Sequence, residues 1–487
     1  MFPLKLGRIM SFKPFFRHFQ DSSVLWSWAF NGVRTASGII LLPLLLLKLS
    51  KADLGMFYTF GAITQLVPIV DFGFAVSVGR FVSYAMGGAE DIKAHGMGAK
   101  TTTTTPNYQL LWHLLFTTRR LYSWLSLIAL ILAGLFGTAM VGMAIEETTS
   151  PELTWVAWVI TLSSMVLEVY LGWWNTFLMG MNEVFYSARL GTLVNILKLI
   201  LASVLLFAGV GLLALPIATL VSSTLLRYAA RRRCYQLLHC HSAPKSFETK
   251  HLLEKLWPNS WRVGIQVLSS YLRNAVTLFI CTKAFNLEST GTFGLSLTIV
   301  AMIQSLSCVW TQVKWPAVGQ HLMRHDYASI HSLLRPRFLM QFLTFGLISV
   351  VLIPLCPICI AWFSVTKQVM PMPWLIVLTL NSMLELHFTF WTTLMSMENR
   401  LPFLWPTVIT NACSLLLALA LVQFTSLKLG ALVLAPLLAS GVFNYWYWAI
   451  AGAANLKTTW WNFVFRTAPL CDQRLVNNRR NAGMLCP

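Results

Sequence analysis

Residues 54–85 read LGMFYTFGAITQLVPIVDFGFAVSVGRFVSYA, and this stretch decides the class of fold. At a rise of about 1.5 Å per residue, a helix of this length exceeds the roughly 30 Å hydrocarbon core of a bilayer. The stretch nevertheless contains Pro68, Asp71 and Arg80. A charged side chain inside a membrane costs about 3 kcal/mol on insertion scales, so it usually faces a partner or a water-filled cavity. We therefore expect a membrane helix, bent near Pro68, that lies beside a polar path.

Composition extends this interpretation to the whole chain. The 487 residues are 56% apolar and only 11% charged, with a mean hydropathy of +0.65, whereas soluble domains carry about 25% charged residues. The pattern predicts an all-α polytopic membrane protein. About 12 spans are expected, at residues 24–47, 54–85, 121–145, 155–178, 190–210, 212–228, 263–285, 292–313, 338–363, 374–396, 403–424 and 429–451.

The spans divide the chain into two six-helix lobes, an N-lobe of residues 21–228 and a C-lobe of residues 263–451. Residues 1–20 combine phenylalanines with basic residues, which predicts a short amphipathic helix on the cytoplasmic surface. We expect a basic cytoplasmic linker at 229–262 and a basic cytoplasmic tail at 452–487.

The basic residues indicate which ends of the spans face the cytoplasm. With both termini inside, the predicted inner segments hold 27 of the 36 lysines and arginines, the outer loops five and the spans four. Such an excess is typical of the cytoplasmic loops of multi-pass membrane proteins. It accounts for the net charge of +19 without any nucleic acid partner, and it predicts that both termini are cytoplasmic.

Short matches indicate that the two lobes are related repeats. A shift of 216 residues aligns Leu178–Met181 with Leu394–Met397 and Asn195 with Asn411. Parallel repeats in transporters place the substrate path where the two repeats meet. The alternative is chance matching between leucine-rich helices.

Besides Arg80, three basic residues fall inside predicted spans: Arg34 in the first, Lys198 in the fifth and Arg273 in the seventh. Arg34 and Arg273 hold similar places in the two halves. A surplus of positive charge suits an anionic head group, and arginine binds phosphate through two parallel hydrogen bonds. We expect these residues to form a cationic substrate-binding cavity; structural ion pairs or extension toward the lipid head groups are the alternatives.

Three acids, Asp71, Glu168 and Glu385, also fall inside the spans, and the two glutamates occupy matching places in the fourth helix of each half. We predict that these acids couple transport to H⁺ or Na⁺ or act as gates; a structural ion pair is the alternative for the glutamates. Asp71 is expected at the depth of Arg34, where the two could pair. Arg80 is expected at the level of the lipid head groups.

The chain lacks the sequence patterns of several enzyme classes. It has no G-x-x-x-x-G-K-[ST] loop, so direct use of ATP is not supported. It shows no Ser/His/Asp constellation and no set of residues with metal-ligand spacing. We therefore expect a protein that is not an enzyme and that needs no cofactor and no metal.

The second span resembles a known family in three segments: Leu54-Gly55-x-Phe57, Asp71-Phe72-Gly73-Phe74 and Arg80. They are similar to segments of the bacterial lipid-linked polysaccharide flippases (O-antigen, Wzx-type) of the multidrug/oligosaccharidyl-lipid/polysaccharide (MOP) exporter superfamily. The resemblance implies a MATE-like fold whose two lobes surround a V-shaped, cationic cavity that opens to one side at a time. It also implies that an ion gradient moves a polyprenyl-pyrophosphate-linked oligosaccharide, for lipopolysaccharide or another surface polysaccharide, across the cell inner membrane.

The resemblance implies further partners, namely a polysaccharide polymerase and glycosyltransferases. Two other functions remain open at this point. A drug or cation antiporter of the same fold would need the acids but not Arg34 and Arg273. A non-transporting membrane scaffold of a glycan-synthesis complex would tolerate the loss of every charge within the membrane.

Overall fold

The computed structural model describes residues 22–64, 67–96, 105–238, 249–285, 287–362 and 369–465. Every regular element in these ranges is a helix, which confirms the predicted all-α class. The predicted amphipathic helix at residues 1–20 lies outside the described residues, and so does the tail beyond residue 465.

The N-lobe consists of the helices from α2 to α10. Its elements are α2 (Ser23–Lys48), α3 (Lys51–Thr64), α4 (Val67–Asp71), α5 (Phe74–Met86), α6 (Tyr108–Leu132), α7 (Thr138–Ala144), α8 (Pro151–Gly180), α9 (Val184–Phe207) and α10 (Ala214–Leu238). Single turns of π- or 3₁₀-helix occupy Ala133–Gly137, Ile145–Glu147 and Gly211–Leu213.

The C-lobe consists of the helices from α11 to α19. Its elements are α11 (Thr249–Ala284), α12 (Leu287–Gln312), α13 (Trp315–Met323), α14 (Tyr327–Trp362), α15 (Met372–Met397), α16 (Leu404–Phe424), α17 (Leu429–Gly441), α18 (Asn444–Asn455) and α19 (Trp460–Phe465). Because α10 continues to Leu238 and α11 begins at Thr249, much of the stretch expected as a linker at 229–262 is helical.

Nine stretches of the described chain are long and apolar enough to cross a membrane. They are Tyr108–Met143, Pro151–Gly180, Val184–Phe207, Gly211–Leu238, Leu252–Ala284, Ser289–Met323, Tyr327–Leu355, Leu404–Phe424 and Leu429–Asn455. The other three predicted spans correspond to α2, to the interrupted series from α3 to α5, and to α15. The chain is therefore a multi-pass membrane protein.

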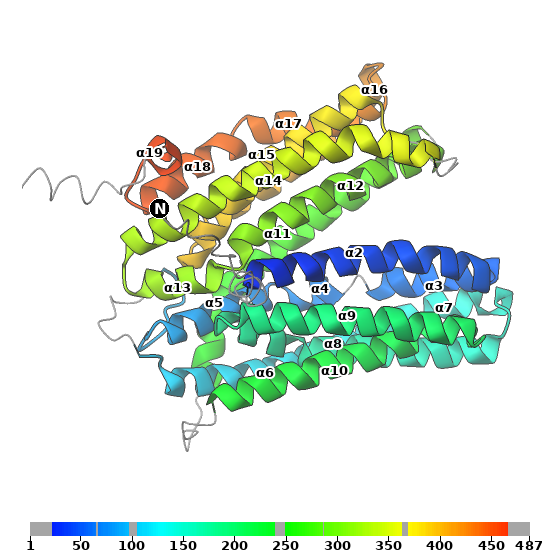
Figure 1. The fold of residues 1–487 in the computed structure, drawn as a ribbon, viewed down its shortest axis with the longest axis horizontal. Helices are drawn as coiled ribbons and strands as arrows, with labels where there is room; N and C mark the ends of the chain where they lie inside the picture. Colours follow the sequence, from blue (N-terminus) through cyan, green and yellow to red (C-terminus); the bar gives the residue numbers. More distant parts are fainter. Residues whose placement is uncertain are drawn as a thin grey trace, which may run out of the picture.

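The two lobes meet at one end and diverge toward the other (Figure 1). At the narrow end, α5 packs against α11 and α13 of the C-lobe, and α6 packs against α11. A further contact joins α2 to α12. The loops at the narrow end are those predicted to be cytoplasmic, so the predicted topology makes the wide end the external one.

The predicted second span is divided into α3, α4 and α5, and one break within the described residues lies between α4 and α5. Phe72 and Gly73 adopt left-handed backbone conformations there, with φ values of 46° and 79°. A Cβ atom at Gly73 would lie 2.6 Å from the Cβ of Val263 on α11. Pro68 lies in the first turn of α4, where a helix tolerates proline, and residues 65 and 66 just before it lie outside the described residues. Glycine at position 73 lets the C-lobe approach this break.

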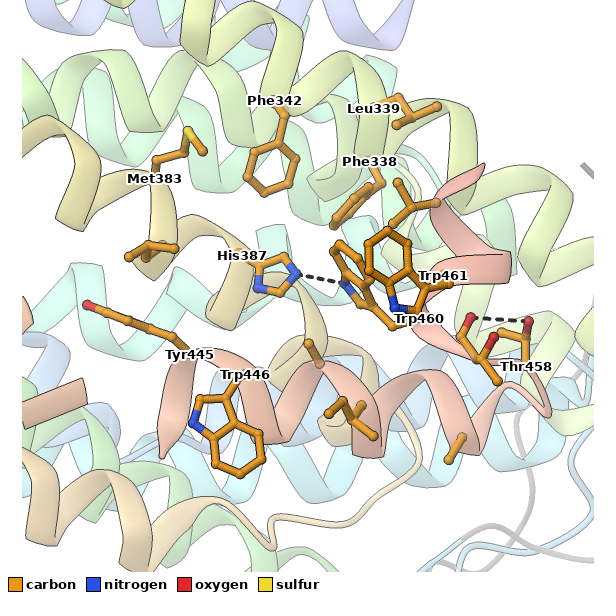
Figure 2. Close-up of a pocket in the computed structure, with 16 residues that line it drawn as sticks. Phe338, Leu339, Phe342, Met383, His387, Tyr445, Trp446, Thr458, Trp460 and Trp461 are labelled. Carbon is orange, nitrogen blue, oxygen red and sulfur yellow. Dashed lines mark hydrogen bonds between the residues drawn. The ribbon is translucent and has the colours of Figure 1, made fainter. Parts of the chain in front are cut away.

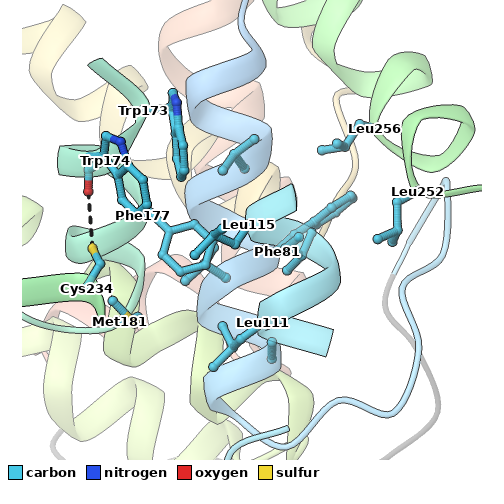
Figure 3. Packing of buried hydrophobic residues seen from close by; sticks show 14 of the residues in the cluster. Phe81, Leu111, Leu115, Trp173, Trp174, Phe177, Met181, Cys234, Leu252 and Leu256 are labelled. Atoms are coloured by element: carbon cyan, nitrogen blue, oxygen red, sulfur yellow. Dashed lines mark hydrogen bonds between the residues drawn. The ribbon is translucent and has the colours of Figure 1, made fainter. Parts of the chain in front are cut away.

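The core of the N-lobe gathers near the narrow end (Figure 3). Its buried side chains include Phe81 on α5, Leu111 and Leu115 on α6, Trp173 and Phe177 on α8, Cys234 on α10, and Leu252 and Leu256 on α11. The first turns of α11 thus pack on the N-lobe before the helix continues into the C-lobe. Close packing of this kind holds membrane helices together, since lipid supplies little hydrophobic driving force between them.

Candidate functional site

A cavity inside the N-lobe holds three of the predicted site residues. Arg34, Glu168 and Lys198 line this space of about 430 Å³ together with Asn195. An adjoining cavity of about 500 Å³ shares Arg34, Glu168 and Asn195, and it reaches Gln312 on α12 of the other lobe. The N-lobe cavity therefore continues into the space where the lobes meet.

Glu168 is paired in this cavity with a residue that the sequence pattern placed elsewhere. Its Oε1 atom lies 3.2 Å from Nη2 of Arg227 on α10. The Arg227 side chain is 12% exposed. Arg227 lies at the very end of the predicted span 212–228 and is not among the predicted site residues. The helix-favouring residues that follow it were the available signal that α10 continues.

Neither Arg34 nor Lys198 forms a salt bridge with an acid in the part of the chain that the structure describes. No carboxylate there lies within salt-bridge distance of either side chain. The guanidinium of Arg34 stands over the ring of Phe30, 5.9 Å from its centroid. Because Arg227 already neutralises Glu168, the two adjoining cavities carry a surplus of positive charge.

The C-lobe has a cavity of about 260 Å³ at the corresponding place. It contains the predicted residues Arg273 and Glu385. The structure brings them together as an ion pair, with Arg273 Nη1 2.8 Å from Glu385 Oε1. Their side chains are 19% and 26% exposed. The charges of this pair cancel, so the C-lobe cavity lacks the surplus found in the N-lobe.

The two lobes thus use corresponding glutamates with arginines from different helices. Glu168 on α8 pairs with Arg227 on the last helix of its lobe, whereas Glu385 on α15 pairs with Arg273 on the first helix of its lobe. This difference leaves Arg34 without a carboxylate, although it holds a place similar to that of Arg273. Within the described ranges, no three His, Cys, Asp or Glu side chains are grouped to hold a metal ion.

Asp71 lies apart from the other predicted residues. Its carboxylate accepts hydrogen bonds from the Tyr122 hydroxyl and, at 3.1 Å, from the backbone N–H of Ala75. No salt bridge joins Asp71 to Arg34 among the described residues, so the expected pairing is wrong. The break before α5 directs the carboxylate toward the N-terminus of that helix, where a negative charge is favoured.

Arg80 is buried, which contradicts its expected position at the lipid head groups. The residue is 1% exposed, and its guanidinium donates across the lobes to the carbonyl of Ser396. It also donates to Oγ of Ser77 at 3.5 Å. The prediction assumed a straight span, whereas the break at Gly73 leaves α5 packed between the lobes.

Polar contacts close the narrow end of the molecule; we call them the latch, defined as Arg80, Tyr84, Asn259, Ser260 and Asn399. The Tyr84 hydroxyl donates to the carbonyl at position 397, beside the acceptor of Arg80. The hydroxyl of Ser260 on α11 donates to the hydroxyl at position 77 on α5, at 2.9 Å. These contacts join α5 of the N-lobe to two separate segments of the C-lobe.

Asn259 and Asn399 form the centre of the latch, and both residues are fully buried. Nδ2 of Asn259 donates to Oδ1 of Asn399 at 2.6 Å and to the carbonyl of Ala94 at 2.8 Å. Nδ2 of Asn399 donates to the carbonyl of Lys93 at 2.9 Å. Asn399 follows α15 in a left-handed conformation, with φ of 59°. The pair therefore fixes the loop after α5 against the C-lobe.

Glu398 stands next to the latch, just beyond the end of α15. It is 4% exposed and accepts a hydrogen bond from Nδ2 of Asn455 at 2.8 Å. Burial raises the pKa of its carboxyl from 4.5 to about 7, against the opposing effects of Arg400 and of the Asn455 hydrogen bond. A proton on Glu398 is therefore favoured while this end stays closed.

Three solved structures are similar to the chain over nearly all of its length. A mutant of a MATE transporter has a TM-score of 0.64 at 13% identity, over 90% of this chain and 97% of its own. An outward-facing multidrug resistance MATE family transporter of the MOP superfamily has the same values. A mutant of the Vibrio cholerae MATE transporter VcmN has a TM-score of 0.65 at 15% identity, over 90% and 97% of the two chains. The chain has the MATE fold.

The MATE fold confirms the predicted architecture of two helical lobes. The similar structures are transporters rather than enzymes. No protein-family model matches the chain, and no curated protein sequence matches it. Identities of 13% to 15% establish the fold alone, so the substrate must be argued from the residues of the site.

Proposed function

We propose that this MATE-fold protein is a flippase for a polyprenyl-pyrophosphate-linked oligosaccharide. The substrate, a repeat unit of a surface polysaccharide, moves from the inner to the outer leaflet of the cell inner membrane. Movement is coupled to an H⁺ or Na⁺ gradient, and both termini of the chain face the cytoplasm. The proposal combines the charge of the site with the resemblance of the second span to lipid-linked polysaccharide flippases.

The single observation that carries the proposal is the surplus of positive charge beside the space between the lobes. Arg34 and Lys198 line the N-lobe cavity without a salt bridge to any acid of the described residues, while Arg227 neutralises Glu168. A pyrophosphate group would meet two cations there, and arginine can donate two parallel hydrogen bonds to it. A cationic drug would be repelled by the same charges.

Transport by this fold requires the lobes to alternate between two arrangements. To admit a substrate from the cytoplasmic leaflet, the narrow end must open, which breaks the hydrogen bonds of Asn259 and Asn399. Protonation of Glu168 or Glu385 would remove the charge that its arginine pairs with. Protonation of Asp71 would weaken its hydrogen bonds at the start of α5. Each acid therefore offers a way for an ion to bias one arrangement.

A drug or cation antiporter is the second candidate, because one similar structure is a multidrug resistance transporter. In that function Asp71, Glu168 and Glu385 would carry the coupling. Arg34 and Lys198 would then be dispensable.

The test uses cells in which the gene for this chain is deleted and then replaced by variants. We expect deletion to abolish surface polysaccharide and to accumulate the lipid-linked intermediate on the inner leaflet. Arg34→Gln and Lys198→Gln should each lower the rate of translocation about tenfold, as expected for one lost charge-assisted contact. Arg232→Gln, at an exposed position on α10, is the matched control and should complement fully.

Other outcomes contradict the proposal in different ways. Unchanged polysaccharide after deletion would exclude a flippase. Full complementation by Arg34→Gln and Lys198→Gln, together with loss in Glu168→Gln, would favour the antiporter. Full complementation by every charge variant would favour the remaining function, a non-transporting membrane scaffold for a complex of polymerase and glycosyltransferases.

A further inference from the structure

An apolar groove of about 790 Å³ runs along the C-lobe, lined by α14, α15, α18 and α19 (Figure 2). It meets α15 at Met383 and His387, whereas the ion-pair cavity meets the same helix at Glu385. Successive residues of a helix are turned by about 100°, so the groove and the ion-pair cavity lie on opposite faces of α15. The groove is thus separate from the proposed substrate path.

The polar groups that line the groove already have partners. Nε2 of His387 accepts a hydrogen bond from the indole N–H group of Trp460 at 3.0 Å (Figure 2) and another from that of Trp391 at 3.1 Å. The Tyr445 hydroxyl donates to Oδ1 of Asn381 at 2.7 Å. The remaining lining is mainly aromatic and aliphatic. The groove therefore suits a hydrocarbon chain better than a ligand that needs hydrogen bonds.

One side of the groove faces the membrane. Leu339, Trp446 and Ile450 belong to its lining, yet they are 38%, 51% and 58% exposed. They lie on α14 and α18, within two of the stretches that are long and apolar enough to cross a membrane. Their exposed surfaces meet lipid chains, so a chain can enter the groove from the side without crossing water.

A positive charge stands at the end of the groove that α19 closes. Nη2 of Arg335 donates to the carbonyl of Val464, a lining residue, at 3.2 Å. The Nε atom of Arg335 is buried without a hydrogen-bond partner, and no carboxylate of the described residues lies within salt-bridge distance. Trp461 on α19 is 66% exposed, as tryptophans at the level of lipid head groups commonly are. The charge thus stands where a lipid phosphate would lie.

We propose that the groove is a binding site for an anionic phospholipid, with an acyl chain between α14 and α18 and the phosphate beside Arg335. The lipid belongs to the leaflet at the narrow end of the molecule, which the predicted topology makes the cytoplasmic one. Bound lipid packs against the back of α15, the helix that carries Glu385. The site is independent of which substrate the transporter moves.

The test measures lipid binding to the purified full-length protein by native mass spectrometry. Titration compares phosphatidylglycerol with phosphatidylcholine of the same acyl chains. The wild type should retain one phosphatidylglycerol with about tenfold preference, because the choline cation of phosphatidylcholine opposes the attraction between its phosphate and Arg335. Ala449→Trp fills the groove and should lose this lipid. Arg335→Gln should bind the two lipids equally.

Matched controls separate the groove from general effects on the surface. Leu416→Trp adds the same bulk on α16, at a position that is 66% exposed, and Arg232→Gln removes a charge from the N-lobe. Both should bind lipid as the wild type does. If Ala449→Trp fails to fold, Arg335→Gln decides the matter, because it leaves the apolar lining unchanged.

Three results would overturn the proposal. The first is equal binding of the two phospholipids by the wild type, or unchanged binding by Arg335→Gln and a folded Ala449→Trp. The second is a groove that retains polyprenyl phosphate but no phosphatidylglycerol, which would assign it to the chain of a substrate. The third is phosphatidylglycerol binding only after removal of residues 466–487, which would make the tail the occupant.

Discussion

Arg227 shows how one residue changes the charge that a substrate meets. Without it, Glu168 would offset one of the two cations that share its cavity. With it, the Glu168 carboxylate forms a salt bridge at 3.2 Å, and Arg34 and Lys198 form none with any acid of the described residues. Sequence alone located both cations and the glutamate, but the pairing depends on how α8 and α10 pack. That packing could not be deduced from hydropathy.

Arg273 and Glu385 should contribute more to the free energy of unfolding as an ion pair than either residue does without the other. Arg273→Met or Glu385→Gln leaves one charge of a mostly buried pair without its partner, so we expect each to lower the free energy of unfolding by about 2 kcal/mol. The double variant should recover most of this loss. Chemical unfolding in detergent measures all three.

The control for this cycle is Asp91→Asn, whose carboxylate is 71% exposed in its pair with Lys255. It should change stability by less than about 1 kcal/mol. Strictly additive losses in the double variant would show that the Arg273–Glu385 contact contributes little.

Glu398 should make stability depend on pH. Its pKa is raised in the folded protein from 4.5 to about 7, so the folded state binds this proton more tightly than the unfolded state does. The contribution is complete below pH 4.5 and is lost as the pH rises through about 7. Glu398→Gln mimics the protonated form. Its stability should match that of the wild type near pH 4.5 and exceed it by on the order of 2 kcal/mol near pH 8.

Unfolding free energies across this pH range check the prediction, with Glu90→Gln at an exposed position as the control. A difference between Glu398→Gln and the wild type that stays constant with pH would contradict it.

The break between α4 and α5 marks the limit of prediction for a single element. The apolar stretch with Pro68, Asp71 and Gly73 predicted a bent helix beside a polar path. The position of the bend depends on contact with α11, since the backbone at Phe72 and Gly73 is left-handed where the C-lobe approaches. A contact between residues so far apart along the chain leaves no periodicity in the sequence. The buried position of Arg80 follows from the same contact.

Gly73→Ala should disturb this element more than an ordinary glycine change. The new Cβ would meet Val263 at 2.6 Å and would sit at a φ of 79°, so we expect a loss of about 2–4 kcal/mol in unfolding free energy. Gly73→Ala combined with Val263→Ala should recover the steric part. Gly38→Ala in α2, where nothing lies within 4 Å, is the control and should be neutral or stabilising. Equal effects at the two glycines would contradict the role of the break.

At the scale of the molecule, the two lobes are alike in helices and different in contacts. The all-α class, the multi-pass character and the two-lobe architecture could be predicted from hydropathy and short repeats. Asn182 and Asn399 illustrate what could not: each lies two residues beyond the end of α8 or α15, with φ of 68° and 59°. Among the described residues, the side chain of Asn399 donates to the carbonyl of Lys93 in the other lobe, whereas no hydrogen bond joins Asn182 to the C-lobe.

Asn399→Gly should therefore release the latch without straining the backbone, since glycine accepts a left-handed φ. We expect the lobes to separate more often at the narrow end and to approach at the wide end. Spin labels at Leu47 and Phe424, both exposed, would report shorter distances by electron–electron double resonance in a cysteine-depleted background. Asn182→Gly removes the same side chain from the left-handed position that follows α8 and should leave the distances unchanged. An unaltered distribution in Asn399→Gly would show that the latch does not control the lobes.

Arg80 gives this closure a thermodynamic consequence. In the closed arrangement its charge is held by a peptide carbonyl and a hydroxyl, and no described carboxylate balances it at salt-bridge distance. Separation of the lobes takes away the carbonyl and exposes the guanidinium to whatever enters. By reciprocity of linked equilibria, any anion that binds Arg80 only in the open arrangement must favour opening by the same factor that opening favours its binding. Opening of the narrow end and binding of an anion would thus each favour the other through the side chain of Arg80.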